Sequence, residues 1–247
     1  MIELEACSVA YGRNTVFSDV TVSVERGKTL AILGPSGCGK TTLLYTAAGL
    51  IEPASGRSTI DGVAVHRGDR RVGLVLQEYG LFPWFTVAEN VELGLRLHGV
   101  KKTDRREIAR GALAAVGMTG TETRYVATLS GGESQRVAIA RTWALSPGVL
   151  LMDEPFSALD ALSRETLQDM LRVLLRKKPV AAILVTHSID EAVLLGSSIA
   201  VMYGNPARLE IVENTALGTD DDRVRTSKRY FEAARRVRAV FEERVRA

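Results

Sequence analysis

Eight residues near the start of the chain, Gly34 to Thr41, constrain its fold more than any other feature. They read GPSGCGKT and match the phosphate-binding loop pattern G-x-x-x-x-G-K-[ST]. The apolar run Thr29 to Leu33 precedes them, and a helical pattern from Thr42 to Ala48 follows. Glycines let successive backbone N–H groups turn towards phosphate oxygens, and a helix start adds a favourable dipole. The sequence therefore predicts a strand, a phosphate-binding loop and a helix in direct succession.

This loop predicts a site for a nucleoside triphosphate with magnesium. The candidate nucleotide contacts are all of its residues and the one after it: Gly34, Pro35, Ser36, Gly37, Cys38, Gly39, Lys40, Thr41 and Thr42. Lys40 is expected to reach the β- and γ-phosphates as a catalytic group, and the Thr41 hydroxyl to ligate Mg²⁺. GTPases, small-molecule kinases, helicases and transport ATPases share such a loop, so the remaining sequence must decide among them.

Four short apolar runs lack the alternation that half-exposed strands show. They are Thr29 to Leu33, Val72 to Leu76, Val149 to Met152 and Ala181 to Val185. Such runs indicate strands buried on both faces of a mostly parallel sheet. Ligands of open α/β sheets bind beyond the carboxyl ends of the strands. We therefore expect the loop to meet Gln77, Asp153, Glu154 and His187, which follow the other three runs.

Two further patterns complete the predicted fold. Alternating Val20, Val22 and Val24, and an Asp-Gly turn within residues 58–65, favour an antiparallel β layer. Helix-compatible spacings of Val87, Val91 and Leu95, and later of Ile108, Leu113 and Val116, favour a helical insertion. The predicted class is α/β, a P-loop NTPase (RecA-like) parallel-sheet core with an antiparallel β subdomain and an inserted α-helical subdomain. The predicted boundaries are 1–84 with 147–220 for the core and β subdomain, 85–146 for the helices, and 221–247 for a C-terminal helix.

Net charge, cysteine content and hydropathy narrow the predicted cellular compartment and the classes of binding partner. The 32 Lys and Arg residues against 29 Asp and Glu residues give a net charge of +3, which is too small to indicate a nucleic-acid-binding face. The two cysteines are Cys7 and Cys38, and a disulfide to Cys38 would obstruct the glycine-rich loop. No apolar run approaches the length of a membrane span, and the first residues lack a basic signal-peptide region. These features predict a protein of a reducing cytoplasmic compartment that does not bind nucleic acid.

An ordered set of motifs in the second half of the chain is more specific than the loop. Residues 129–136 read LSGGESQR, residues 149–155 read VLLMDEP and residues 157–160 read SALD, with His187 beyond them. In this order they resemble the ATP-binding cassette (ABC) family, and the resemblance runs from about Ile2 to about Glu210. A non-cassette P-loop enzyme such as a small-molecule kinase would not need the LSGG segment.

The resemblance implies a role for each residue at the strand ends. Tyr11 would stack on adenine, and Gln77 would coordinate Mg²⁺ and orient the attacking water. Asp153 would hold Mg²⁺ through water, Glu154 would act as the general base, and His187 would contact the γ-phosphate. Plainer interpretations remain open: Tyr11 and His187 as packed side chains, Gln77 as a surface loop residue, and the two carboxylates as a cap for a following helix.

The LSGG segment implies a partner. Ser130 precedes a helical pattern and can cap it, which leaves free N–H groups for an anion. In the family this helix end meets the γ-phosphate bound by a second cassette, so Ser130, Gly131 and Gly132 would contact nucleotide in trans within a homodimer, with Asp160 at the interface. Glu133 departs from the commonest pattern, which has glutamine there. A carboxylate suits a helix start but repels a triphosphate, so its geometry is an open question.

Residues 77–91, QEYGLFPWFTVAENV, resemble importer cassettes of the nitrate, sulfonate and taurine group. The resemblance implies a bacterial importer subunit at the cytoplasmic face of the membrane, energising uptake of a small anion by hydrolysing ATP. Permease subunits would be direct partners and a substrate-binding protein an indirect one. Pro83 and Trp84 would bury against the permease, or else form a structural turn.

The alternative is a soluble cassette ATPase not coupled to transport. It is disfavoured because 52 residues separate Gln77 from Ser130, too few for a long coiled coil.

The C-terminal segment is basic and amphipathic. From Arg223 onward it carries nine Arg or Lys and three Glu. Apolar residues recur at spacings of three and four, which predicts a helix: Phe231, Ala234, Val237, Phe241 and Val245. Such a helix either docks on its own domain with a solvated charged face or lies on an anionic membrane surface.

Overall fold

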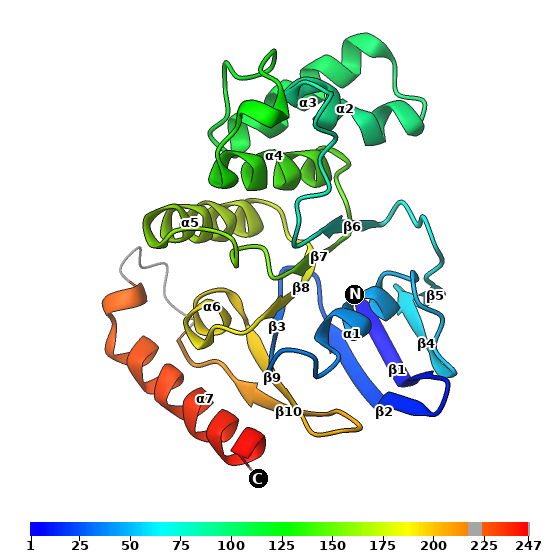
Figure 1. The fold of residues 1–247 in the computed structure, drawn as a ribbon, viewed down its shortest axis with the longest axis vertical. Helices are drawn as coiled ribbons and strands as arrows, with labels where there is room; N and C mark the ends of the chain where they lie inside the picture. The colour runs from blue at the N-terminus through cyan, green and yellow to red at the C-terminus, as the bar shows by residue number, and fades with distance from the viewer. Residues whose placement is uncertain (217–223, 247) are drawn as a thin grey trace.

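The computed structural model describes residues 1–216 and 224–246, and its strands form two sheets (Figure 1). The larger has the order β10-β9-β3-β8-β7-β6 and is parallel except for β10, which pairs antiparallel with β9. Its strands are β3 (Thr29–Leu33), β6 (Val72–Val75), β7 (Val149–Asp153), β8 (Ala181–Thr186), β9 (Ser198–Tyr203) and β10 (Arg208–Glu213). The four predicted apolar runs are confirmed as β3, β6, β7 and β8, with each end within one residue.

The second sheet is antiparallel, as predicted, with the order β2-β1-β4-β5. Its strands are β1 (Ile2–Tyr11), β2 (Asn14–Val24), β4 (Ser55–Ile60) and β5 (Val63–Ala64). Asp61 and Gly62 join β4 to β5, and both have positive φ, which matches the tight hairpin turn that an Asp-Gly pair favours. The alternating Val20, Val22 and Val24 of β2 are all buried.

Helix α1 (Lys40–Ala47) lies between the two sheets (Figure 1). Its Leu43, Leu44 and Ala47 are fully buried in one cluster with apolar side chains of both sheets. Strand β7 shows why the central runs do not alternate. Val149 and Leu151 join this cluster, whereas Leu150 and Met152 join the cluster on the opposite face of the sheet. Because successive side chains point to opposite faces, a strand covered on both sides is apolar throughout.

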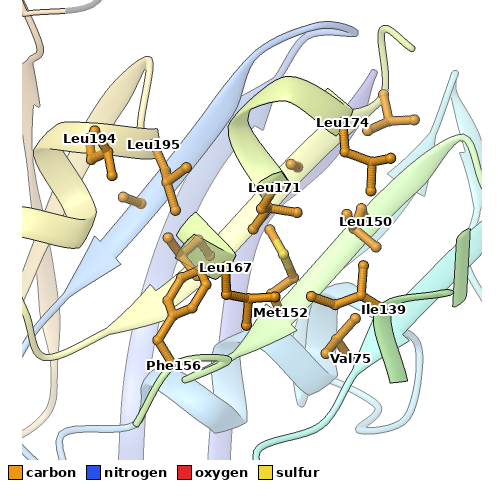
Figure 2. Close-up of a cluster of buried hydrophobic side chains, with 14 of the residues drawn as sticks. Val75, Ile139, Leu150, Met152, Phe156, Leu167, Leu171, Leu174, Leu194 and Leu195 are labelled. Atoms are coloured by element: carbon orange, nitrogen blue, oxygen red, sulfur yellow. The ribbon is translucent and has the colours of Figure 1, made fainter. Parts of the chain in front are cut away.

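The other face of the large sheet is covered by helices. The core on this face is formed by side chains of two strands, β6 and β7, and three helices, α4 (Gly131–Ala144), α5 (Ala161–Lys177) and α6 (Ile189–Leu195). Figure 2 shows part of this core. Phe156, Leu167 and Leu171 are fully buried beside Met152. This packing fixes the ends of β7 and β8, from which the candidate site is built.

The predicted helical insertion lies at one end of the longest axis of the molecule, at the top of Figure 1. It comprises α2 (Val87–Leu97), α3 (Lys102–Ala115), the 3-10 turn η1 (Val126–Thr128) and α4. Ile108 lies within α3, as its spacing indicated, but its side chain is exposed. The buried side chains of α3 are Ala109, Ala112 and Leu113, so Ile108 lies one residue off the packed face.

The C-terminal helix α7 (Lys228–Arg246) follows the 3-10 turn η2 (Val224–Thr226) and docks on the protein's own core. Tyr230, Ala233 and Val237 form its buried face. The predicted stripe was therefore wrong at Phe231, whose side chain is 56% exposed because it lies one residue beyond Tyr230, the true contact. Residues 221–223 and 247 of the predicted segment lie outside the described residues. Within 1–216 and 224–246, no helix is long and apolar enough to cross a membrane.

Candidate functional site

The glycine-rich loop connects β3 to α1 and forms the floor of an open cleft of about 400 Å³. The cleft is lined by Val16, Ser36, Gly37, Gly39, Lys40, Thr41, Thr42, Gln77 and Glu154. Gly39 stands at the N-cap of α1 with a φ of 102°. A Cβ there would lie 2.6 Å from Val16 Cγ1, so neither the backbone conformation nor the space admits another residue.

Lys40 is 5% exposed, and its ammonium group is directed back onto the loop. Its Nζ donates to the carbonyl oxygens of Gly34 at 3.0 Å and Pro35 at 2.8 Å. The same Nζ lies 3.8 Å from Glu154 Oε1. The loop therefore holds a positive charge in place at the bottom of the cleft, as phosphate binding requires.

Thr41 and Asp153 bring a hydroxyl and a carboxylate together from two different elements. The Thr41 hydroxyl donates to Asp153 Oδ1 at 3.0 Å, which links the first turn of α1 to the end of β7. Asp153 is 2% exposed, and this burial raises the pKa of its carboxyl group. Oxygen donors of this kind are the ligands that Mg²⁺ prefers.

The raised pKa of Asp153 predicts a measurable effect of this side chain on the stability of the protein. Because its pKa is raised on folding, its contribution to stability is full below the unfolded pKa and is lost as the pH rises through the folded pKa. We expect Asp153→Asn to raise the Tm of the nucleotide-free protein at pH 7.5 by up to about 3 °C, and this gain to shrink towards pH 5. Scanning calorimetry at both pH values measures the difference. The exposed Asp104→Asn is the control, and a Tm below the parent at pH 7.5 contradicts the argument.

Glu154 lines the cleft, and His187 contacts Glu154 from the end of β8. Glu154 has a left-handed φ of 42°, and its backbone N–H donates to Val185 O at 3.0 Å. Its Oε2 lies 3.1 Å from His187 Nδ1, while Oε1 faces Lys40. A carboxylate held between an imidazole and an ammonium group can accept a proton from a water molecule in the cleft.

Gln77 lies on the loop between β6 and α2 and lines the same cleft. Helix α4 holds the loop that follows Gln77, because the Arg141 guanidinium donates to Tyr79 O at 2.9 Å and Gly80 O at 2.6 Å. Asn90, fully buried, both donates to and accepts from the backbone of Phe82. The predicted convergence at the strand ends therefore places Gln77, Asp153, Glu154 and His187 around the loop.

The residues of the LSGG segment and Asp160 lie together in a second cluster, called the signature cluster below. Ser130 caps α4 by accepting from Glu133 N at 3.2 Å, as predicted. A Cβ on Gly131 would lie 3.3 Å from the Tyr79 hydroxyl, and one on Gly132 would lie 3.5 Å from Ser163 Cβ. Asp160 caps α5 by accepting from Ser163 N at 3.0 Å, which lowers the pKa of Asp160. The four predicted trans residues thus adjoin one another: Ser130, Gly131, Gly132 and Asp160. None of them lines the cleft at the loop.

Tyr11 is 56% exposed at the end of β1, and it does not line the cleft either. Its adenine-stacking role stays a prediction. The structure adds residues that the sequence did not indicate. Val16 of β2 lines the cleft and packs on Gly39, while Asn14 and Asn205 line a smaller hollow beside Ser36 to Cys38. A valine in an alternating strand carries no signal of this role, because only the tertiary fold brings β2 over the loop.

Comparison with known proteins identifies the class to which this fold and site belong. A family model described as "ABC transporter" matches residues 17–157. The chain therefore belongs to the ABC transporter family, as the motifs predicted, and is an ATPase of the cassette type.

Relatives in the same family extend over most of the chain. The taurine import ATP-binding protein TauB of Pseudomonas fluorescens (strain Pf0-1) is 39% identical over 99% of this chain and 96% of its own length. TauB of Escherichia coli (strain K12) is 40% identical over 85% of this chain and 82% of its own. An uncharacterized ABC transporter ATP-binding protein of Methanocaldococcus jannaschii, MJ0412, is 41% identical over 94% of this chain and 86% of its own.

Solved structures confirm the fold. The dimeric structure of the bacterial ABC transporter cassette MJ0796 matches with a TM-score of 0.72 and 31% identity, over 81% of this chain and 94% of that one. A dimeric post-hydrolysis state of MJ0796 bound to ADP and Pi matches with a TM-score of 0.74 and 29% identity, over 86% of this chain and 98% of that one. The predicted α/β cassette with its antiparallel sheet and helical insertion is thus confirmed.

Proposed function

We propose that this protein is the ATP-hydrolysing subunit of an importer for a small sulfonate of the taurine type. The observation that carries the proposal is that Lys40, Thr41 and Glu154 line one open cleft at the strand ends. Asp153 contacts Thr41 there, and His187 contacts Glu154. The substrate class is supported by the taurine import proteins, which are 39–40% identical to this chain over most of its length. These relatives are named for taurine and not for nitrate, the other anion that the sequence resemblance suggested.

In this proposal each predicted site residue has one task. Lys40 and the loop N–H groups bind the β- and γ-phosphates, and Tyr11 stacks on the adenine base. Glu154 accepts a proton from the attacking water, which Gln77 orients, and His187 contacts the γ-phosphate. The 3.1 Å contact between His187 and Glu154 supports the pairing of the last two tasks, because it fixes the carboxylate beside the imidazole.

The donor set of the cleft fits a magnesium ion. The Thr41 hydroxyl and Asp153 carboxylate lie 3.0 Å apart and are hard oxygen donors, with the Gln77 amide lining the same cleft. Thr41, Gln77 and Asp153 are the residues that would hold Mg²⁺ together with the phosphates. When bound, the ion neutralises charge that develops on the phosphate oxygens.

We further propose that two copies close head to tail around two ATP molecules. Ser130, Gly131, Gly132 and Asp160 lie outside the cleft of their own chain, so a second copy is needed to bring them to a nucleotide. The dimeric MJ0796 structures support such an assembly for a chain of this fold. A soluble cassette not coupled to transport is disfavoured, because relatives that match most of the chain are import subunits.

The aromatic residues after Gln77 are the proposed contact with the permease. Phe82, Trp84 and Phe85 pack edge to face or tilted, with ring centroids 5.6 to 6.4 Å apart. Trp84 is nevertheless 68% exposed, and an exposed indole supported by two other rings suits a partner surface. The protein would then sit at the cytoplasmic face of the membrane, held by permease subunits that receive substrate from a binding protein.

Trp84→Ala separates docking from hydrolysis. We expect the ATPase rate of the isolated subunit to stay within about twofold of the parent, because Trp84 lines neither the cleft nor the signature cluster. Association with the permease should weaken by about tenfold or more, as for a central interface tryptophan. Co-purification with the permease and ATPase assays measure the two effects. Leu97→Ala, at another exposed apolar residue, is the control. Unchanged co-purification would remove Trp84 from the interface.

Uptake measurements test the proposed function directly. In the source organism, deletion of the gene should abolish ATP-dependent uptake of radiolabelled taurine or a related alkanesulfonate and leave nitrate uptake unchanged. A plasmid copy of the parent should restore uptake, and a Glu154→Gln copy should not. Loss of nitrate uptake alone would overturn the substrate class. Normal uptake of every solute tested would overturn the transport role itself.

A further inference from the structure

Glu133 places a negative charge at the end of α4 that, in the proposed dimer, meets the γ-phosphate of the second copy. Its carboxylate closes a capping box, accepting from Ser130 N at 2.9 Å while Ser130 accepts from Glu133 N. The helix start therefore gains an acceptor that suits its own N–H groups. The same charge repels an approaching triphosphate, so the closed dimer requires something to compensate it.

Arg124 supplies that compensation. Its Nη1 donates to Glu133 Oε1 at 2.7 Å and its Nη2 to Glu133 Oε2 at 3.3 Å, a two-pronged contact that occupies both carboxylate oxygens. The contact with Arg124 is also the largest cause of the lowered pKa of Glu133. With Ser130 N on the same Oε2, the carboxylate is directed back towards residues 124 and 130 of its own chain.

Arg124 is itself held in place. Its Nη2 donates to Thr128 O at 3.2 Å, and its backbone oxygen accepts from Val87 N at 2.9 Å. A β-bridge joins the next residue, Tyr125, to Thr86. The backbone of residue 124 is thus fixed against the first turn of α2, and the Thr128 carbonyl group holds the guanidinium beside Glu133. Only arginine offers the planar fork that this bidentate geometry uses, so lysine would not replace it.

We propose that Arg124 is a positioning residue for the phosphate-binding end of α4. It holds the Glu133 carboxylate in the capping box and cancels its charge, so that the nucleotide of a second copy can approach Ser130 and Gly132. This inference rests on the proposed ATP-sandwich dimer. The pair is partly exposed in the single chain and becomes desolvated only when a second copy covers it.

The test compares three variants of the full chain in a Glu154→Gln background, which slows hydrolysis. Arg124→Gln should raise the dissociation constant of the Mg-ATP dimer by about tenfold or more, because an uncompensated carboxylate then faces each triphosphate. Glu133→Gln should stay within about threefold of the parent. The double variant Arg124→Gln/Glu133→Gln should return to within about threefold of Glu133→Gln. Light scattering over a range of protein concentrations gives the constants.

Two controls separate this role from a structural one. Arg110→Gln removes one positive charge from an exposed site of the same helical region and should leave dimerisation unchanged. The nucleotide-free Tm of Arg124→Gln should fall by no more than a few degrees, since a partly exposed ion pair contributes little to folding.

Each contrary outcome has a distinct meaning. If Arg124→Gln dimerises as tightly as the parent, Arg124 has no positioning role. If the double variant is as weak as Arg124→Gln, the loss does not depend on the carboxylate, and the inference is equally overturned. Both outcomes leave the dimer standing. A parent that stays monomeric in saturating Mg-ATP overturns the proposed dimer, and this inference with it.

Discussion

Replacing Glu154 with glutamine should lower the rate of ATP hydrolysis by about 100-fold or more while leaving ATP binding intact. Glutamine keeps the size of the side chain but cannot accept a proton from water, and a positioned general base contributes about 10² to 10⁴ in rate. Binding should be as tight as in the parent or tighter, because the carboxylate that lies 3.8 Å from Lys40 Nζ no longer competes with phosphate for that charge. Steady-state phosphate release and titration calorimetry measure the two quantities.

A matched loss of charge elsewhere serves as the control. Glu52→Gln removes an exposed carboxylate remote from the loop and should leave both rate and affinity within about twofold of the parent. If Glu154→Gln hydrolyses ATP at the parent rate, Glu154 is not the general base. Loss of binding along with the rate would instead show that the carboxylate shapes the loop.

Replacing Lys40 with alanine should reduce ATP affinity by about 100-fold or more. Hydrogen bonds from a charged donor to phosphate contribute about 1.5 to 3 kcal/mol each, and Lys40 is positioned for two. In the nucleotide-free protein Lys40 donates to the carbonyl groups of Gly34 and Pro35, and the contact with Gly34 is buried. Removing the ammonium group leaves a buried acceptor without its partner, so we expect the fold to lose about 1 to 3 kcal/mol of stability.

Calorimetric titration of Lys40→Ala with Mg-ATP measures the loss, and thermal unfolding in its absence checks the fold. Lys40→Met, which keeps the aliphatic bulk, separates lost packing from lost charge and should bind as poorly as Lys40→Ala. The exposed Lys28→Ala is the control for net charge. Affinity within tenfold of the parent in both Lys40 variants would exclude the proposed phosphate contact.

Local spacing was enough to predict four of the six strands of the large sheet and the loop. The runs that became β3, β6, β7 and β8 were recognisable because a strand covered on both faces needs no polar alternation. The order of polar residues after those strands then placed Gln77, Asp153 and His187 near the loop, since parallel strands end at one edge. These inferences depend only on features that lie close together in the sequence.

Contacts between distant segments could not be predicted in this way. Nothing about Val16 distinguishes it from its neighbours in β2 until the hairpin is folded over Gly39. Arg141 and Arg124 look like ordinary helix and loop cations, yet one holds the Tyr79–Gly80 backbone and the other neutralises Glu133. Phe231 was misplaced for a related reason: a stripe of similar side chains fixes a helix face only to within about one residue.

The C-terminal docking seen in the fold involves polar groups as well as apolar ones. Arg225 donates to Gln168 Oε1 at 3.0 Å, Gln168 donates to the buried Glu191 at 3.3 Å, and Glu191 accepts from Thr186, the neighbour of His187. Burial raises the pKa of Glu191, so this carboxyl group depends on its partners. In a protein that consists of residues 1–216 alone, the apolar surface that Tyr230 and Val237 cover would be exposed to water. The hydrogen bonds that Gln168 and Thr186 donate to Glu191 would be exposed as well. We therefore expect a chain that ends at residue 216 to have a lower free energy of unfolding than the full chain.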